Sequence, residues 1–151
     1  MKDFAVVVIA YVPERITRFV KNLENTPFGD VDYDLFFIHN CIENPSIKNR
    51  WDPRPKQEVD LVSNTLRSYN GNKIIVEREN VGEDLGAYHF AYNLIKHNYK
   101  YIFFVNEACS IHQPGWLRYA RDFYDSNEYV VALSPQMCRG IAYPYCLPST
   151  Y

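Results

Sequence analysis

Five short apolar runs recur along the chain, and each has the length of a β-strand rather than of a helix. They cover residues 4–11, 34–39, 73–77, 101–105 and 129–133. Most of these runs are almost continuously apolar instead of alternating between apolar and polar residues. That pattern is typical of strands covered on both faces, as in a parallel sheet.

Between the apolar runs, apolar residues recur at helical spacing. The four groups are Ile16, Phe19, Val20 and Leu23; Val59, Val62, Leu66 and Tyr69; Ala87, Phe90, Ala91, Leu94 and Ile95; and Trp116, Ala120 and Phe123. Each group gives a helix one apolar stripe that can pack on a sheet. Strands that alternate with helices predict βαβ units. We therefore expect an α/β fold, with a mostly parallel open sheet and helices on both faces.

The residues that follow the strands are the candidates for ligand binding, because open parallel sheets bind ligands beyond the carboxyl ends of their strands. They form four short stretches, 10–12, 39–41, 78–80 and 106–108. The connection 40–55 is polar and contains prolines and Trp51, and we expect it to be a surface loop.

Charge and length narrow the possible partners. The chain has 151 residues, which suits one domain, and a net charge of -2 without a cluster of Lys and Arg. Nucleic acids and anionic membrane surfaces both attract basic patches, so neither is an expected partner. The apolar run at the N-terminus is interrupted by Pro13, and no other run approaches the length of a membrane span. No integral membrane segment is therefore expected.

The cysteines and the missing motifs exclude several further classes. The four cysteines form no CxxC pair and have no histidine at zinc-finger spacing, so we expect reduced thiols in a cytoplasmic protein. The first strand is not followed by GxGxxG or a P-loop, and no GxSxG is present. A nicotinamide dehydrogenase, an NTPase and a serine hydrolase are therefore not indicated.

Three segments in order resemble the GT-A glycosyltransferases, specifically the inverting family 2. They are VVVIAYVPERITRFVKNL, ERENVGEDLGAYHFAYNLI and YIFFVNEACSIHQPGWLRYARDF. The second is similar to the Asn-x-Gly stretch that opens a helix in rhamnan-synthesis-type members. The third has the family's order of strand, acidic motif and Pro-Gly-Trp-Leu helix start. The resemblance covers residues 4–135 and implies one GT-A-like domain over residues 1–151, either complete or lacking a full acceptor-binding half.

This resemblance implies an enzyme that moves a hexosyl group from a nucleotide-diphosphate sugar to a glycan hydroxyl, with inversion. The donor-binding residues it implies are Ala10, Tyr11, Asn40, Asn80, Gly82 and Asp84. Asn40 can donate to and accept from a base edge, although a turn residue is an equal interpretation. Asp84 can bind ribose or uracil, or it can be a first-turn carboxylate that favours the helix dipole.

The diphosphate of such a donor usually requires Mn²⁺ or Mg²⁺, which prefer oxygen ligands. The family provides an Asp-x-Asp motif after the fourth strand, where this chain has Asn106-Glu107-Ala108. Glu107 is therefore the one expected metal ligand. The family's general base lies beyond the fifth strand, and this chain has no Asp or Glu after Glu128.

These departures keep a second hypothesis open, a non-catalytic GT-A-like module that binds a glycan or a protein. A sugar nucleotidyltransferase is a third and weaker hypothesis, because its glycine-rich phosphate loop does not follow the first strand.

Overall fold

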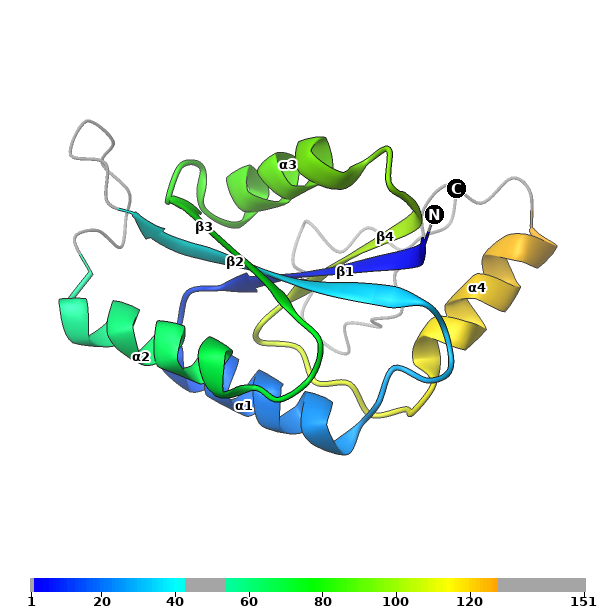
Figure 1. Cartoon of the computed structure of the whole chain (residues 1–151), viewed down its shortest axis with the longest axis horizontal. Coiled ribbons are helices and arrows are strands. Elements are labelled where there is room, and N and C mark those ends of the chain that lie inside the picture. Colours follow the sequence, from blue (N-terminus) through cyan, green and yellow to red (C-terminus); the bar gives the residue numbers. More distant parts are fainter. Residues whose placement is uncertain (1, 43–53, 128–151) are drawn as a thin grey trace, which may run out of the picture.

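The computed structural model describes residues 2–42 and 54–127, in which strands and helices alternate (Figure 1). The strands are β1 (Lys2–Ala10), β2 (Tyr33–Ile42), β3 (Ile74–Glu79) and β4 (Tyr99–Asn106). The helices are α1 (Pro13–Asn25), α2 (Lys56–Ser68), α3 (Glu83–Ile95) and α4 (Trp116–Ser126). They match the first four predicted strands and the four predicted helices. The fifth predicted strand, 129–133, lies outside the described residues.

The described strands form one sheet in the order β3-β2-β1-β4, and every pair is parallel. β1 lies in the interior, and each of its residues from Phe4 to Ala10 is at most 1% exposed. A strand covered on both faces needs apolar residues at every position, which is the pattern seen in its sequence. The predicted mostly parallel sheet is confirmed.

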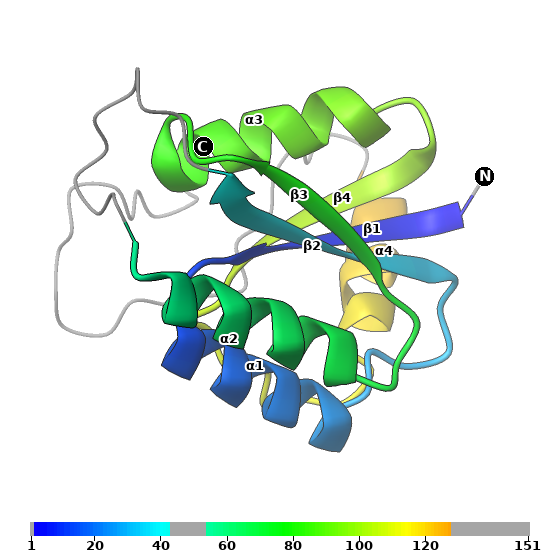
Figure 2. The same ribbon diagram turned by 60° about the vertical axis from the view of Figure 1, so that its left-hand side comes forward.

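Alternation along the strands sends side chains to two faces, and helices cover both. On one face, Phe4, Val6 and Val8 of β1 pack with α1, α2 and α4. On the other face, Ala5, Val7 and Ile9 pack beneath α3. Figure 2 shows α1 and α2 side by side below the sheet and α3 above it. The predicted layer arrangement is therefore confirmed.

The apolar stripes are buried to different extents. Those of α1 and most of α2 are buried as predicted. In α3, Ala87, Ala91 and Ile95 are buried, whereas Phe90 and Leu94 are 38% and 52% exposed, so only part of the predicted stripe packs on the sheet. In α4, Phe123 is 42% exposed, while Leu117 and Ala120 make the contact. A single helix on a sheet buries a narrow strip, and the margins of a wide stripe stay outside it.

The expected surface loop over residues 40–55 is wrong at both of its described ends. Asn40 lies within β2 and is 3% exposed, and Arg54 is 7% exposed just before α2. Residues 43–53, with Trp51, lie outside the described residues. None of the described helices is long and apolar enough to cross a membrane.

Candidate functional site

A cleft of about 570 Å³ lies at the carboxyl edge of the sheet. The connection that follows β1 crosses one face of the sheet through α1, whereas the connection that leads to β4 crosses the other face through α3. The two connections therefore diverge between the neighbouring strands β1 and β4. Open parallel sheets bind ligands where successive connections diverge in this way. The residues lining the cleft come from strand ends and helix starts: Tyr11, Val12, Pro13, Glu14, Arg15, Asn40, Arg54, Pro55, Glu58, Asn80, Glu83, Asp84, Asn106 and Glu107.

The first turns of α1, α2 and α3 all border this cleft, through Glu14, Glu58 and Glu83 respectively. In a parallel βαβ arrangement the helices run opposite to the strands, so they begin at the strands' carboxyl edge (Figure 2). None of these three helices has a side-chain hydrogen bond that caps its N-terminus. The positive ends of the helix dipoles and the backbone N–H groups of the first turns favour an anion in the cleft.

Glu107 joins the end of β4 to the end of β1. The N–H of Tyr11 donates to its Oε2 at 2.7 Å, and the N–H of Val12 donates to its Oε1 at 2.9 Å. The side chain is 4% exposed. This carboxylate therefore fixes the backbone at the point where β1 turns into α1.

Burial raises the pKa of the Glu107 carboxyl from 4.5 to about 7. The carboxylate of Asp84 acts in the same direction, while the N–H donors of Val12 and Tyr11 and the guanidinium of Arg15 oppose it. The charge of Glu107 is therefore sensitive to pH near neutrality.

Arg54 holds the ends of β1 and β2 together from just before α2. Its guanidinium lies 3.9 Å above the centre of the Tyr11 ring and donates to the carbonyl of Tyr11. It also donates to the carbonyl of Asn40 at 3.3 Å. The stacked guanidinium and phenol form a flat wall of the cleft that can accommodate a planar ring.

Asn40 provides a buried polar atom at the cleft. Its Oδ1 accepts no hydrogen bond from the described part of the chain, although its residue is 3% exposed. An unsatisfied buried acceptor costs free energy, so a donor from a ligand or from water is expected there. Asn80, 5% exposed, lies on the neighbouring connection, where its N–H donates to the carbonyl of Ile42 at 3.3 Å.

Asp84 and Asn106 are in direct contact at the cleft. Nδ2 of Asn106 donates to Oδ2 of Asp84 at 2.8 Å, and Oδ1 of Asn106 accepts the N–H of Ala108 at 2.8 Å. Unlike Glu107, Asp84 is exposed. Its carboxylate is the more accessible oxygen donor for a cation.

The backbone conformation at the start of α3 requires glycine at two positions, Gly82 and Gly86. Gly82 is the N-cap of α3 and has φ 73°, a left-handed conformation that favours glycine. A Cβ on Gly86 would lie 1.8 Å from the carbonyl oxygen of Val81, which also accepts a hydrogen bond from Arg78 at 2.7 Å. Gly86 therefore allows the loop to fold onto the first turn of the helix.

Five of the seven predicted site residues line the cleft together: Tyr11, Asn40, Asn80, Asp84 and Glu107. Ala10 lies fully buried in the core below the cleft, and Gly82 shapes the start of α3 without lining the cleft. Sequence reasoning missed Arg54, which stands between prolines in a segment without periodicity. Its position directly before a helix start, in an otherwise polar connection, was the available signal.

The fold is similar to that of solved structures of S. aureus TarS. A structure of TarS 1–349 in complex with UDP-GlcNAc matches with a TM-score of 0.54 and 19% identity over 83% of this chain. TarS 1–349 without that ligand matches with a TM-score of 0.53 and 18% identity, also over 83% of this chain. These matches cover 32% and 33% of the TarS chains, so this chain spans about a third of their length.

No family model matches the chain, and no curated protein matches it. At this identity, the likeness to TarS establishes the α/β fold alone. The finer resemblance to rhamnan-synthesis-type members stays a prediction.

Proposed function

We propose that this chain is the donor-binding domain of a glycosyltransferase that uses a nucleotide-diphosphate sugar. The observation that carries the proposal is the cleft at the carboxyl edge of the sheet, which is bordered by the first turns of three helices and lined by Asn40, a residue with an unsatisfied Oδ1. A nucleotide-diphosphate sugar matches both features, because it has an anionic diphosphate and a base with N–H donors. The solved TarS structures of the same fold include complexes with UDP-GlcNAc and with UDP, which supports uridine as the base.

The nucleoside half of the donor fits the Tyr11 side of the cleft. The wall formed by Tyr11 and Arg54 offers a flat surface to the base, and Oδ1 of Asn40 can accept a hydrogen bond from a ring N–H. Asn80 lies on the adjacent connection, within the same cleft, and suits the ribose hydroxyls. The backbone of Ala10 and the turn at Gly82 support these residues from behind.

The charges of the cleft favour a divalent cation with the diphosphate. The cleft carries the carboxyl groups of Glu14, Glu58, Glu83, Asp84 and Glu107 but the guanidinium groups of only Arg15 and Arg54. A diphosphate would be repelled by these carboxylates unless Mn²⁺ or Mg²⁺ joined the two. When bound, such a cation neutralises charge on the nucleotide leaving group.

Asp84 fits the role of direct ligand best, since it is exposed and accepts a hydrogen bond from Nδ2 of Asn106. Glu107, the ligand expected from the sequence, has both carboxylate oxygens occupied by backbone N–H groups. We propose that Glu107 holds the cleft in shape and faces the cation from behind Asp84.

The proposed reaction is transfer of a hexosyl group to a glycan hydroxyl, with inversion, as in polysaccharide biosynthesis. The family's general base lies beyond the fifth strand, and because this chain has no Asp or Glu after Glu128, no residue of the chain is assigned to that role. A non-catalytic binding module remains the second candidate. It is favoured by the replacement of the family's Asp-x-Asp by Asn106 and a Glu107 that serves the backbone.

Isothermal titration of the full chain with UDP and UDP-GlcNAc, with and without Mn²⁺, tests donor binding. We expect binding that is strengthened by Mn²⁺ and weakened about ten-fold by Asn40→Ala, because loss of one hydrogen bond to a ligand costs about 1.4 kcal/mol. Asp84→Asn should remove most of the gain from Mn²⁺. Asp122→Asn, an exposed carboxylate on α4, is the matched control and should bind normally.

Absence of nucleotide binding by the folded wild-type chain at millimolar concentration would reject the donor-site proposal. Donor hydrolysis then separates the two candidates. Turnover that depends on Mn²⁺ and falls in Asp84→Asn favours the enzyme, whereas nucleotide binding without any turnover favours the module.

A further inference from the structure

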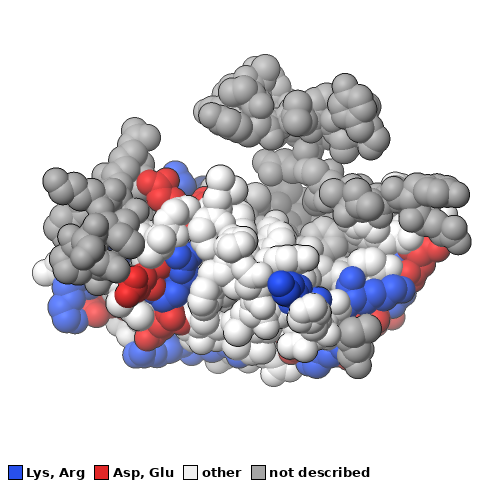
Figure 3. All heavy atoms as spheres, turned by 90° about the horizontal axis from the view of Figure 1, so that it is seen from above, with Lys and Arg blue, Asp and Glu red and all other residues white. Residues whose placement is uncertain are grey.

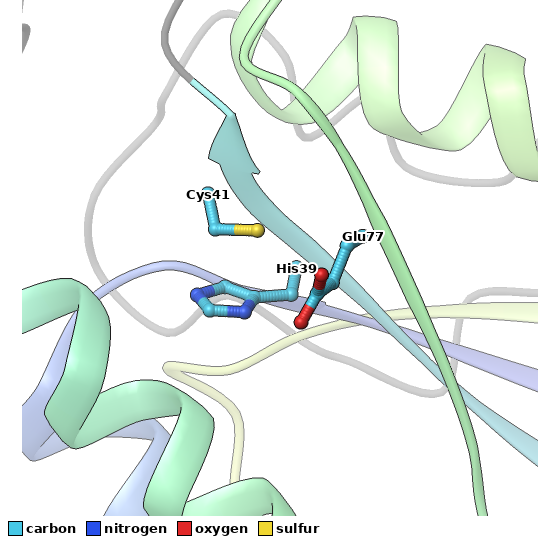
Figure 4. A group of neighbouring side chains, drawn as sticks. All are labelled: His39, Cys41 and Glu77. Carbon is cyan, nitrogen blue, oxygen red and sulfur yellow. The ribbon is translucent and has the colours of Figure 1, made fainter.

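A second cluster of chemically active side chains lies on the α2 side of the sheet, outside the donor cleft. His39 and Cys41 are two residues apart on β2 and point to the same face, and Glu77 of β3 is the register partner of His39. Figure 4 shows the three side chains pointing toward one another, with the carboxylate of Glu77 beside the imidazole ring of His39. One ligand atom from each residue lies within 4.8 Å of the others.

The imidazole of His39 is buried without full hydrogen bonding. The residue is 0% exposed, and its Nε2 has no hydrogen-bond partner among residues 2–42 and 54–127. Its Nδ1 makes only a long contact of 3.5 Å with Oγ of Ser63 on α2. Buried polar atoms are nearly always satisfied, so a missing partner at this position indicates a ligand of the ring.

We propose that His39, Cys41 and Glu77 bind a Zn²⁺ ion. Imidazole nitrogen, thiolate sulfur and carboxylate oxygen are the three donor types that zinc takes in proteins, whereas Mg²⁺, Mn²⁺ and Ca²⁺ prefer oxygen alone. Three protein ligands leave the fourth tetrahedral position to a water molecule. This ion is therefore distinct in chemistry and in place from the cation proposed for the diphosphate.

The spacing of the cluster is close to that of a zinc site. Zinc–ligand bonds of about 2.0–2.3 Å place tetrahedral donor atoms roughly 3.3–3.8 Å apart, and the three ligand atoms here lie within 4.8 Å of one another. The side chain of Glu77 is 51% exposed, and among the described residues its one ion pair, with Arg67, is long at 3.9 Å, so the carboxylate can approach the other two ligands. Zinc binding releases the Cys41 thiol proton to solvent, because the thiolate is the ligand.

The position suggests what the ion does. The pairing of β2 with β3 slips between Asn40 and Ile42, at the level of Cys41. An ion bonded to His39 and Cys41 on one strand and Glu77 on the other would join the strands at this irregularity. Asn40 stands between the two β2 ligands with its side chain on the opposite face, so the same ion would fix the residue that we assign to the base.

The test uses the reduced, metal-free full chain titrated with Zn²⁺ against a chromophoric chelator, and with Co²⁺ as a spectroscopic substitute. We expect one ion per chain and a thiolate-to-cobalt charge-transfer absorption. Cys41→Ser should abolish that absorption and weaken zinc binding by at least about 100-fold, since even outer-shell changes cost 10–100-fold. Cys109→Ser, the other described cysteine, is the matched control and should change neither.

Glu77→Gln provides a second variant that leaves the buried core untouched, and it should also weaken zinc binding while its circular dichroism matches wild type. Zinc affinity in wild type no higher than in Cys41→Ser would overturn the proposal. So would retention of the cobalt absorption in Cys41→Ser, because the ligands would then include other cysteines. If Cys41→Ser does not fold, an unchanged zinc affinity in Glu77→Gln rejects the site by itself.

Discussion

The two faces of the sheet are built from the same strands but are packed very differently. The face under α1, α2 and α4 has a core that includes Phe4, Phe19, Phe37 and Leu66, all fully buried. Of the described helices, α3 alone covers the other face, whose buried members are mostly small or β-branched. The surface on the α3 side shows uncharged side chains at its centre (Figure 3). Leu85, in the first turn of α3, is 80% exposed.

This difference teaches that an apolar stripe predicts a helix more reliably than it predicts burial. α1 and α3 both carry apolar residues at helical spacing, but α1 lies beside α2 while α3 has no described helix beside it. A neighbouring helix buries the margins of the stripe, so the stability of the fold should be concentrated on the α1 side.

The largest expected effect on stability comes from replacing one phenylalanine on each face of the sheet. Phe19→Ala in α1 should lower the free energy of unfolding by about 3–5 kcal/mol, because a fully buried phenylalanine leaves a cavity. Phe90→Ala in α3 should cost about 1 kcal/mol or less, because its ring is 38% exposed. Urea unfolding of both variants measures the difference. Equal losses would show that the two faces contribute alike.

The start of α3 provides the next largest effect. Gly86→Ala should cost about 2–3 kcal/mol, because its Cβ would meet a backbone carbonyl oxygen at 1.8 Å. The loop from Val81 to Asp84 would have to move, so Mn²⁺-dependent nucleotide binding should weaken as well. Ala87→Gly, one residue further along the helix, is the matched control and should cost about 1 kcal/mol without moving the loop. Thermal unfolding and nucleotide titration of both variants distinguish strain from simple loss of helix stability.

Glu107 lines the cleft at the carboxyl edge of the sheet, and its contribution to the free energy of unfolding should depend on pH. Its pKa in the folded chain is about 7 and its ordinary value is 4.5, so the folded chain holds a proton that the unfolded chain has lost between these pH values. The stability that this proton contributes is therefore present below pH 4.5 and is lost as pH rises through about 7.

Glu107→Gln should remove this pH dependence. It should also cost about 1–3 kcal/mol, because its amide Nε2 would face a backbone N–H that now donates to a carboxylate oxygen. Chemical denaturation of wild type and variant across that pH range checks both effects. A variant with the same pH profile as wild type would assign the dependence to another group.

Sequence periodicity was sufficient to predict the described strands, the helices and the parallel sheet, because burial on two faces leaves a direct mark on composition. The carboxyl ends of parallel strands meet at one edge of the sheet. This rule correctly predicted that five residues lie around one cleft: Tyr11, Asn40, Asn80, Asp84 and Glu107. Contacts made by the backbone were not predictable in this way. The sequence shows a carboxylate at Glu107, but it does not show that two N–H groups of the β1 end occupy it.

Arg54 and the cluster around His39 were missed for a related reason. Arg54 acts through carbonyls of residues that are distant in sequence, and no spacing rule links it to Tyr11. His39 and Cys41 lie two residues apart on one strand, and their third partner, Glu77, lies on the adjacent strand. Such a set has no fixed sequence spacing, unlike the ligands of a zinc finger.

The smallest expected effect tests whether α3 is truly open. Leu85→Lys should change the free energy of unfolding by no more than about 0.5 kcal/mol, because a side chain that is 80% exposed loses little contact when it becomes charged. The matched substitution Leu66→Lys, at a fully buried position of α2, should prevent folding. Circular dichroism and urea unfolding measure both. A loss of several kcal/mol in Leu85→Lys would show that another part of the chain or a second molecule covers α3. The α3 face would then be less well packed only when the described residues are considered by themselves.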